Sequence, residues 1–321
     1  MQATAIAHPN VALIKYWGKQ DTETNLPATG SLSITLGGLH TRTTVEFDSA
    51  LKADSLVLEG AADAAADVRM QRVLRELRKH ADTECFARVT SDNDFPTGAG
   101  LASSASGFAA LSKAAAAALD LQLPEQELAR IARLGSGSAP RSLFAGAVLL
   151  DIAAQPGESI CTTVSQPEDW PLEVVVAVTS EARKSISSTT GMEASRSASP
   201  YFDRWVSSHP EDLKQGLEYI AAKDFMSLAD LAEHNCLKMH SLAMSTRPPM
   251  IYWSPATLAC MQTIMEMRAQ GVPVFFTVDA GPQVKAVCLP EATDQVRSAL
   301  TGVPGVLRTL DCTLGQGAWV E

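Results

Sequence analysis

The chain has 321 residues, of which 46% are hydrophobic and 19% are charged. At about 100–200 residues per domain, this length predicts two domains, with one large domain still allowed. The ordinary apolar content excludes disordered, collagen-like and fibrous proteins. Asp and Glu total 36 against 26 Lys and Arg, so the formal net charge is −10. A chain this acidic is not expected to bind nucleic acid or an anionic membrane through its overall field.

The cysteine pattern and the apolar runs predict a compartment. The six cysteines lie far apart, with no C-x-x-C spacing, which fits reduced thiols rather than a disulfide scaffold. The first ten residues have no basic segment followed by an apolar one, so a secretory signal is not expected. No run approaches the roughly 18 apolar residues of a membrane-spanning helix. We therefore expect a cytoplasmic protein.

Strand and helix patterns alternate in the first half of the chain. Short apolar runs predict strands over residues 31–36, 43–47, 55–58 and 86–90. Apolar residues on one face, among them Val68, Val73 and Leu77, predict a helix over 67–80. An alanine run predicts a helix over 107–119, and a proline opens another predicted helix over 124–134. Buried strands are predicted over 143–152 and 172–179.

The second half follows a Ser/Thr/Arg-rich stretch at 180–199, which is the best candidate for a boundary between halves. Helices are predicted at about 200–207, 211–221, 224–243 and 255–270, with strands over 274–278, 284–288 and 307–313. The pattern predicts an α+β protein with domains at 1–182 and 183–321 that share one cleft.

A run of small residues, Pro96 to Gly107, leads directly into the alanine-rich helix. Small residues let the backbone approach a ligand, and a helix N-terminus offers unpaired N–H groups to an anion. The hydroxyls of Ser103 and Ser104 could contact phosphate oxygens or a bound Mg²⁺. A turn with a serine cap is the alternative, and the Walker pattern is absent because no Gly-Lys-Ser/Thr follows.

Three further segments carry chemistry-bearing side chains, each of which also has a purely structural interpretation. Lys15 and Lys19 flank an aromatic pair beside a glycine, and their charges could bind phosphate. The alternative is that both lysines are exposed to solvent at the end of a strand. Arg141 lies in the segment 135–142, which begins with alternating Gly and Ser, and its guanidinium could bind a carboxylate or phosphate. The alternative is that this segment is a flexible loop. Asp279 follows an apolar strand and could act as a general base, although aspartate also begins many turns. Together they predict an anionic substrate with a hydroxyl to be activated.

At these residues the chain resembles the diphosphomevalonate decarboxylase family of the GHMP kinase superfamily. The superfamily's phosphate loop matches 96–105, and the decarboxylase-like segments are 14–19, 135–142, 187–192 and 279–282. The resemblance implies a GHMP kinase-like α+β fold. It comprises an N-terminal domain like domain 2 of ribosomal protein S5, a C-terminal ferredoxin-like α/β sandwich, and an active site in the cleft between them. It also implies homodimers.

The resemblance implies an ATP- and Mg²⁺-dependent reaction. The 3-hydroxyl of (R)-5-diphosphomevalonate is phosphorylated, and phosphate and CO₂ then leave to give isopentenyl diphosphate and ADP. Asp279 matches the carboxylate that accepts or orients the hydroxyl proton, Arg141 matches the group that grips the substrate carboxylate and positions this aspartate, and Lys15 would lie near the transferring phosphoryl group.

The resemblance also assigns binding roles. The substrate contacts are Tyr16, Lys19, Ser136, Ser138, Arg141, Ser188, Thr189 and Met192. The ATP phosphate contacts are Gly98, Gly100, Leu101, Ala102, Ser103 and Ser104. Ser104 is the one proposed protein ligand of Mg²⁺, which is otherwise held through the ATP phosphates.

Two alternatives stay open. Thr190 stands where some bacterial relatives use a basic residue against the diphosphate, so a 5-phosphomevalonate decarboxylase or a mevalonate 3-kinase is possible. A non-catalytic nucleotide-binding homologue is the other alternative. It is disfavoured because the anion-binding groups and the carboxylate are all present.

Overall fold

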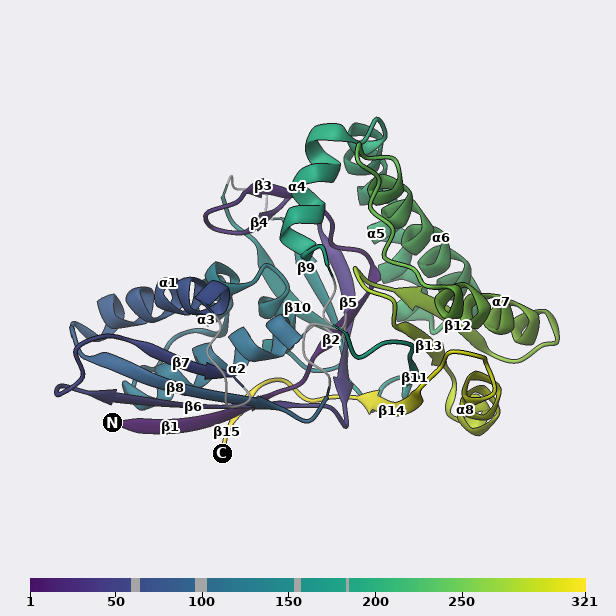
Figure 1. Cartoon of the computed structure of the whole chain (residues 1–321). Helices are drawn as coiled ribbons and strands as arrows, with labels where there is room; N and C mark the ends of the chain where they lie inside the picture. The colour runs from purple at the N-terminus through teal and green to yellow at the C-terminus, as the bar shows by residue number, and fades with distance from the viewer. Residues whose placement is uncertain (59–63, 96–102, 153–156, 183–184) are drawn as a thin grey trace.

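The structure, a computed structural model, describes residues 1–58, 64–95, 103–152, 157–182 and 185–321. Helices and strands are mixed along the described chain (Figure 1). The strands form two large sheets and one short hairpin. This confirms the predicted mixed α+β class. The two termini lie side by side, because the last strand pairs with the first.

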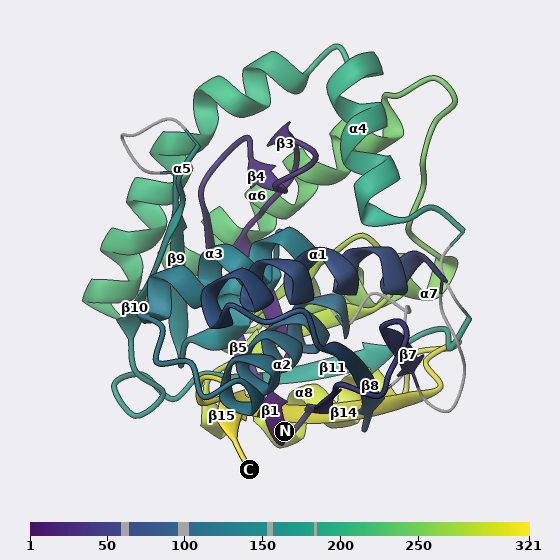
Figure 2. The ribbon, with the colours of Figure 1, turned by 90° about the vertical axis from the view of Figure 1, so that its left-hand side faces the viewer.

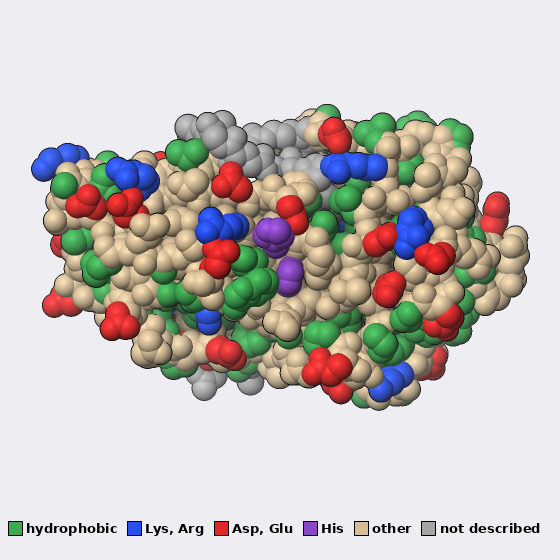
Figure 3. Space-filling view, turned by 90° about the horizontal axis from the view of Figure 1, so that it is seen from below, with side chains coloured by type: hydrophobic (Ala, Val, Ile, Leu, Met, Phe, Trp, Pro, Cys, Tyr) green, Lys and Arg blue, Asp and Glu red, His purple; other side chains and the backbone are tan. Residues whose placement is uncertain are grey.

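The first large sheet has five strands and is covered by helices on one face. Its order is β15 (Trp319–Val320), β1 (Gln2–Ala7), β6 (Thr41–Asp48), β8 (Phe86–Asn93) and β7 (Ser55–Leu58). Burial alternates along β6 and β8, as expected for a sheet with one wet face. The covering helices are α1 (Ala64–Ala81), α2 (Ser103–Ala118) and α3 (Glu125–Gly135). Figure 3 shows acidic and basic side chains interspersed over the face seen from below.

The second large sheet has eight antiparallel strands drawn from both halves of the chain. Seven follow the order β10 (Ile160–Ser165), β9 (Ala147–Asp151), β5 (Ser31–Gly37), β14 (Arg308–Leu314), β11 (Glu173–Val178), β13 (Val284–Cys288) and β12 (Val274–Val278). The eighth, β2 (Asn10–Ile14), pairs with β5. Because this sheet joins both halves, the predicted division at residue 182 stays a prediction.

Helices cover both faces of the C-terminal part of this sheet, which explains its continuous apolar strands. Val174 and Val176 of β11 pack in the cluster that includes α5 (Phe202–Ala222) and α6 (Phe225–Met244). Val175 and Ala177, which point the other way, pack with α7 (Pro255–Ala269) and α8 (Thr293–Thr301). Figure 1 shows the right-hand part of the molecule built in these layers.

Several expected elements differ in the structure. The helices predicted at 200–207 and 211–221 are one helix, α5, with Pro210 inside it. A proline removes one helical hydrogen bond, and here the buried face of the helix is continuous across it. The stretch expected as a boundary contains α4 (Ser188–Ala198), begun by the Ser187 cap on the Thr190 amide. The strand predicted from 143 begins at 147, after the short helix η1 (Ala139–Leu143). Strands β1 and β10 and helix α8 were not predicted.

One predicted core position is wrong. Val68 is 55% exposed, because the buried face of α1 follows Ala66, Met70, Val73 and Leu77 at helical spacing.

The hairpin of β3 (Lys19–Asp21) and β4 (Leu26–Pro27) and helix α4 lie above α1 in Figure 2. Both therefore stand beside the region that α1, α2 and α3 form with the first sheet. Among the described residues, no helix is both long and apolar enough to cross a membrane.

Candidate active site

One cavity of about 420 Å³ collects side chains from both halves of the chain. It is lined by the segment after β2, the start of α2, the loop between α3 and η1, the start of α4 and the end of β12. Every predicted site residue that the structure describes lines it: Lys15, Tyr16, Lys19, Ser103, Ser104, Ser136, Ser138, Arg141, Ser188, Thr189, Met192 and Asp279. The predicted phosphate contacts Gly98, Gly100, Leu101 and Ala102 lie outside the described residues.

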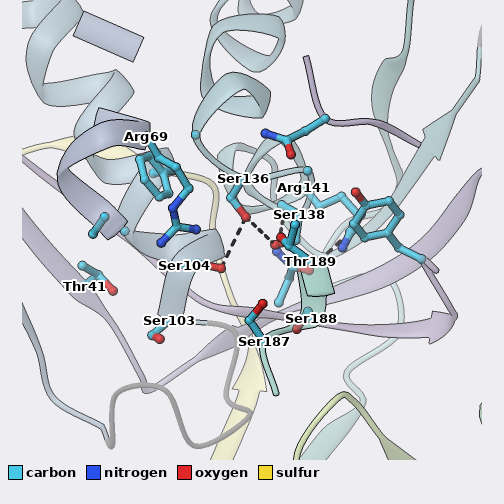
Figure 4. Close-up of a pocket in the computed structure, with 18 of the residues that line it drawn as sticks. Thr41, Arg69, Ser103, Ser104, Ser136, Ser138, Arg141, Ser187, Ser188 and Thr189 are labelled. Atoms are coloured by element: carbon cyan, nitrogen blue, oxygen red, sulfur yellow. Dashed lines mark hydrogen bonds between the residues drawn. The ribbon is translucent and has the colours of Figure 1, made fainter. Parts of the chain in front are cut away.

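Three serines form a chain of hydrogen bonds along one side of the cavity, which we call the hydroxyl cluster. Ser136 Oγ lies 3.3 Å from Ser104 Oγ and 3.0 Å from Ser138 Oγ (Figure 4). Ser104 stands in the first turn of α2, where backbone N–H groups are unpaired within the helix. Hydroxyls can donate or accept, so this side can rearrange around phosphate oxygens.

Tyr16 presents a buried hydroxyl that has no hydrogen-bond partner among the described residues. Its side chain lies against Gly137, where an added Cβ would be 2.2 Å from the hydroxyl oxygen. Burial raises the pKa of Tyr16 to about 12, against the opposing charges of Arg141 and Arg133. The phenol is therefore neutral near pH 7 and can donate to a bound oxygen.

Lys19 links the β3–β4 hairpin to helix α4. Its Nζ donates to Asn25 Oδ1 at 2.7 Å and to Thr189 Oγ1 at 3.3 Å. Burial, with the nearby charge of Arg69, lowers the pKa of Lys19 to about 8. The Thr190 hydroxyl instead pairs with Ser187 at 2.8 Å on the exposed side. Of the two threonines of α4, Thr189 lines the cavity and Thr190 does not.

Arg141 is buried and held by neutral partners. Its Nε donates to Asn10 Oδ1 at 3.3 Å, and its Nη1 donates to Ser31 Oγ at 3.1 Å. The guanidinium also lies 5.4 Å from the centre of the Tyr16 ring. Because neither hydrogen-bond partner is charged, the positive charge of Arg141 remains available to an anionic ligand.

Asp279 lies between two lysines, and we call Lys15, Asp279 and Lys285 the charged cluster. Lys15 Nζ donates to Asp279 Oδ1 at 2.6 Å, and Lys285 Nζ lies 3.3 Å from Oδ2. Burial would raise the pKa of the Asp279 carboxyl, but the two lysine charges outweigh it and hold that pKa well below its usual range. The two lysines contact this carboxylate directly, whereas the hydrogen bonds of Arg141 go to Asn10 and Ser31.

Helix α6 holds the backbone on both sides of this cluster. The side chain of Asn235 accepts the Lys15 N–H at 2.7 Å, directly after β2 ends. Cys236 Sγ accepts the Val278 N–H at 3.2 Å, and His240 Nε2 lies 3.1 Å from the Val278 carbonyl oxygen. One helix therefore fixes the ends of the two strands that deliver Lys15 and Asp279.

Sequence reasoning missed several residues that build the site. Lys285 had a usable signal, a lysine inside the apolar strand 284–288, because such a residue needs a buried partner. Asn10, Asn25 and Asn235 had no comparable signal, since each is placed by a contact distant in sequence. Arg69 of α1 packs over Phe108 at 5.0 Å and lines the cavity near Ser103 and Ser104 (Figure 4).

The side of the cavity around α2 suits a nucleotide phosphate with its own metal ion. The described residues contain no cluster of three or more His, Cys, Asp or Glu side chains that could hold a metal. Ser103 and Ser104 supply hydroxyls at the start of α2, and Arg69 adds a cation. This set fits Mg²⁺ carried by phosphate oxygens and completed by a serine hydroxyl.

Comparisons with known proteins all indicate the same family. The model of the diphosphomevalonate decarboxylase-like N-terminal domain matches residues 7–161, and that of the mevalonate 5-diphosphate decarboxylase C-terminal domain matches 174–312. The diphosphomevalonate decarboxylase of Schizosaccharomyces pombe is 35% identical, over 94% of this chain and 82% of that protein.

Solved structures agree over the whole chain. The mevalonate diphosphate decarboxylase from Enterococcus faecalis, described for its mevalonate diphosphate-mediated ATP binding, is 36% identical. The match covers 100% of this chain and 99% of that one, with a TM-score of 0.91. A structure described as MDDEF in complex with MVAPP, AMPPCP and magnesium matches over the same shares, with 36% identity and a TM-score of 0.92.

Proposed function

The chain belongs to the diphosphomevalonate decarboxylase family, and we propose that it converts (R)-5-diphosphomevalonate and ATP to isopentenyl diphosphate, ADP, phosphate and CO₂. Its fold is the predicted GHMP kinase-like α+β fold, as the match to solved decarboxylases over the whole chain shows. One observation carries the proposal for this chain. A single cavity brings together a carboxylate, buried cations and a chain of hydroxyls, which is what a substrate with a hydroxyl, a carboxylate and a diphosphate needs.

The charged cluster supports the first step, transfer of the γ-phosphoryl group to the 3-hydroxyl. Asp279 can accept a hydrogen bond from that hydroxyl and aim its oxygen at the phosphorus. Because its pKa lies well below the usual range, Asp279 is a weak base, and we assign it to orienting the hydroxyl while the P–O bond forms. Lys15 supplies positive charge where the phosphoryl oxygens gather.

Arg141 supports the second step, loss of phosphate and CO₂. A tertiary alcohol is a poor leaving group, whereas its phosphate ester leaves readily. As the C3–O bond breaks, the electrons of the C–CO₂⁻ bond form the new double bond, and CO₂ departs. A guanidinium matches a carboxylate geometrically, so Arg141 can hold that group until it leaves.

The remaining lining residues support binding of the diphosphate tail. Tyr16 offers an unused hydroxyl, and Lys19 offers a cation next to Thr189. Ser136, Ser138 and Ser188 add hydroxyls, and Met192 packs against the same pocket from α4. Thr189 contributes a hydroxyl but no charge, and Lys19 supplies positive charge at this end.

ATP is the second substrate, and Mg²⁺ accompanies its phosphates. Ser103 and Ser104 at the start of α2 are the residues that would contact them, with Ser104 as the metal's protein ligand. When bound, Mg²⁺ neutralises charge on the phosphate oxygens during phosphoryl transfer.

The proposal is tested by measuring ADP and CO₂ together with Mg·ATP and one of three substrates: mevalonate, 5-phosphomevalonate or 5-diphosphomevalonate. Equal release of ADP and CO₂ with the diphosphate, at far higher kcat/KM than with the monophosphate, is expected. Preference for the monophosphate would reassign the substrate. ADP without CO₂ would make the protein a kinase, and no turnover with any substrate would make it a binding protein.

A cytoplasmic location and a homodimer are also proposed. The six cysteines are all free thiols, which fits a reducing compartment. The dimer rests on the family resemblance alone, and sedimentation velocity at micromolar protein tests it.

A further inference from the structure

Lys285 is a charged residue near the start of the apolar strand β13. It lies in β13 between Val284 and Ala286, and its side chain is 2% exposed. Taking an ammonium group out of water is costly unless an opposite charge receives it. The nearest carboxylate is that of Asp279, whose Oδ2 lies 3.3 Å from Lys285 Nζ.

The two lysines approach the carboxylate from different sides. Lys15 bonds Oδ1 and lines the cavity, whereas Lys285 reaches Oδ2 from within the sheet. Two ammonium groups therefore share one carboxylate. Burial lowers the pKa of Lys285, and the charge of Asp279 opposes that effect. With Lys285 removed, Lys15 and Asp279 would form a neutral pair.

The other titratable groups near the charged cluster do not compensate the negative charge of Asp279. Burial lowers the pKa of His240 to about 3, so its ring is neutral near pH 7. Burial also raises the pKa of the Cys236 thiol, which stays protonated. Arg141 is positive and bonds Asn10 and Ser31 rather than Asp279. The negative charge of Asp279 is therefore compensated by its two lysines.

We propose that Lys285 is a positioning residue that holds and neutralises Asp279, so that the positive charge of Lys15 serves the transferring phosphoryl group. The kinetic part of this inference rests on the proposed function, since it needs a phosphoryl group to transfer. The electrostatic part concerns Asp279 alone and can be measured without turnover.

The electrostatic part is tested by following the Asp279 carboxyl carbon by ¹³C NMR in aspartate-labelled protein, with Asp279→Asn to assign the signal. In Lys285→Met the pKa of Asp279 should rise by about one unit or more, as expected when one of two nearby cations is lost. Lys285→Arg keeps the charge and should keep the carboxyl titration close to that of the wild type.

The kinetic part is tested with Mg·ATP and 5-diphosphomevalonate. In Lys285→Met, kcat should fall about tenfold to a hundredfold, the range expected when charge stabilisation in a closed site is weakened. KM for the substrate should change less than threefold. The acid limb of the kcat–pH profile should move up by the same amount as the pKa of Asp279, and Lys285→Arg should restore part of kcat.

Arg268→Met is the matched control, because Arg268 pairs with buried Glu233, which accepts the Phe276 N–H on the neighbouring strand β12. It should lower stability without moving the Asp279 titration or the acid limb. If Lys285→Met behaves like this control, the role of Lys285 is structural and the proposal is wrong. If Lys285→Met does not fold, Lys285→Gln takes its place. If wild-type protein releases no CO₂, the proposed function fails, while the NMR titration still decides the role of Lys285.

Discussion

The two sides of the cavity use different chemistry. The charged cluster is built on strand ends, and its groups pair with one another, with Lys15 and Lys285 bound to Asp279. The hydroxyl cluster stands on helix ends and loops, and its serines bond chiefly to one another. Fixed charges stabilise a developing transition state without reorganising, whereas neutral hydroxyls exchange partners readily when a ligand enters. The first side is therefore suited to the reaction and the second to binding.

The largest expected effect comes from removing the centre of the charged cluster. In Asp279→Asn, kcat should fall by about a thousandfold, because the hydroxyl loses its orienting carboxylate and two buried lysines lose their partner. Binding of a non-hydrolysable ATP analogue should remain within about threefold of the wild type. Steady-state kinetics and calorimetric titration measure the two quantities.

Glu233→Gln provides the control for that variant. Glu233 is a buried carboxylate on α6 that pairs with Arg268 and accepts the Phe276 N–H, outside the cavity. The Glu233→Gln variant should lose about 3 kcal/mol of unfolding free energy, and its kcat should stay close to that of the wild type. Equal losses of kcat in the two variants would show that disturbing this part of the sheet, not the chemistry of Asp279, accounts for the effect.

A smaller and different effect is expected on the hydroxyl side. Ser136→Ala and Ser138→Ala should each raise KM for 5-diphosphomevalonate by about tenfold or more, the value of one hydrogen bond to a charged group, with kcat little changed. Ser112→Ala is the control, because that buried serine bonds the Phe108 carbonyl within α2 and does not line the cavity. A fall in kcat instead of a rise in KM would contradict the division between the two sides.

Sequence patterns predicted the two sides unequally. The Gly/Ser segments before α2 and η1 are visible as local runs, so the family resemblance could point to Ser104, Ser136 and Ser138 as site residues. Asp279 and Lys15 were also predicted, but the arrangement that pairs them was not. It depends on β2 and β12 meeting beside α6, with 264 residues between the two side chains. Contacts of that range leave no local pattern.

The same reasoning applies to the fold. A short strand pattern predicted β6, and continuous apolar runs predicted β11, β12 and β13, since these patterns follow from which faces are buried. The stretch containing α4 reads as a linker because it is rich in Ser and Thr. It forms a helix through the Ser187 cap and the burial of Gly191, Met192 and Ser195.

Lys19, a cation beside the hydroxyl side, should give the binding step its own pH dependence. The pKa of Lys19 is lowered to about 8, chiefly by burial, so the free enzyme loses this charge as the pH rises through that value. An anionic tail binds the protonated form, and KM for the substrate should therefore rise above about pH 8, approaching tenfold per unit, while kcat changes less. In Lys19→Arg the charge persists and the rise should disappear. A rise in KM that is unchanged in Lys19→Arg would assign it to another group.

The smallest expected effects are those of Gly107→Ala, which should change stability and ATP binding in opposite directions. Gly107 lies inside α2 and lines the cavity, and an added Cβ there would have none of the described side chains within 4 Å. Gly107→Ala should raise the unfolding free energy by about 0.5–1 kcal/mol, because alanine loses less conformational freedom in a helix. The same methyl group would occupy space beside Ser103 and Ser104, so KM for ATP should rise a few-fold while KM for 5-diphosphomevalonate stays constant. Denaturant unfolding and initial-rate kinetics measure both. Greater stability with an unchanged KM for ATP would mean that the nucleotide does not contact this face of α2, and the assignment of the phosphate-binding side would have to move.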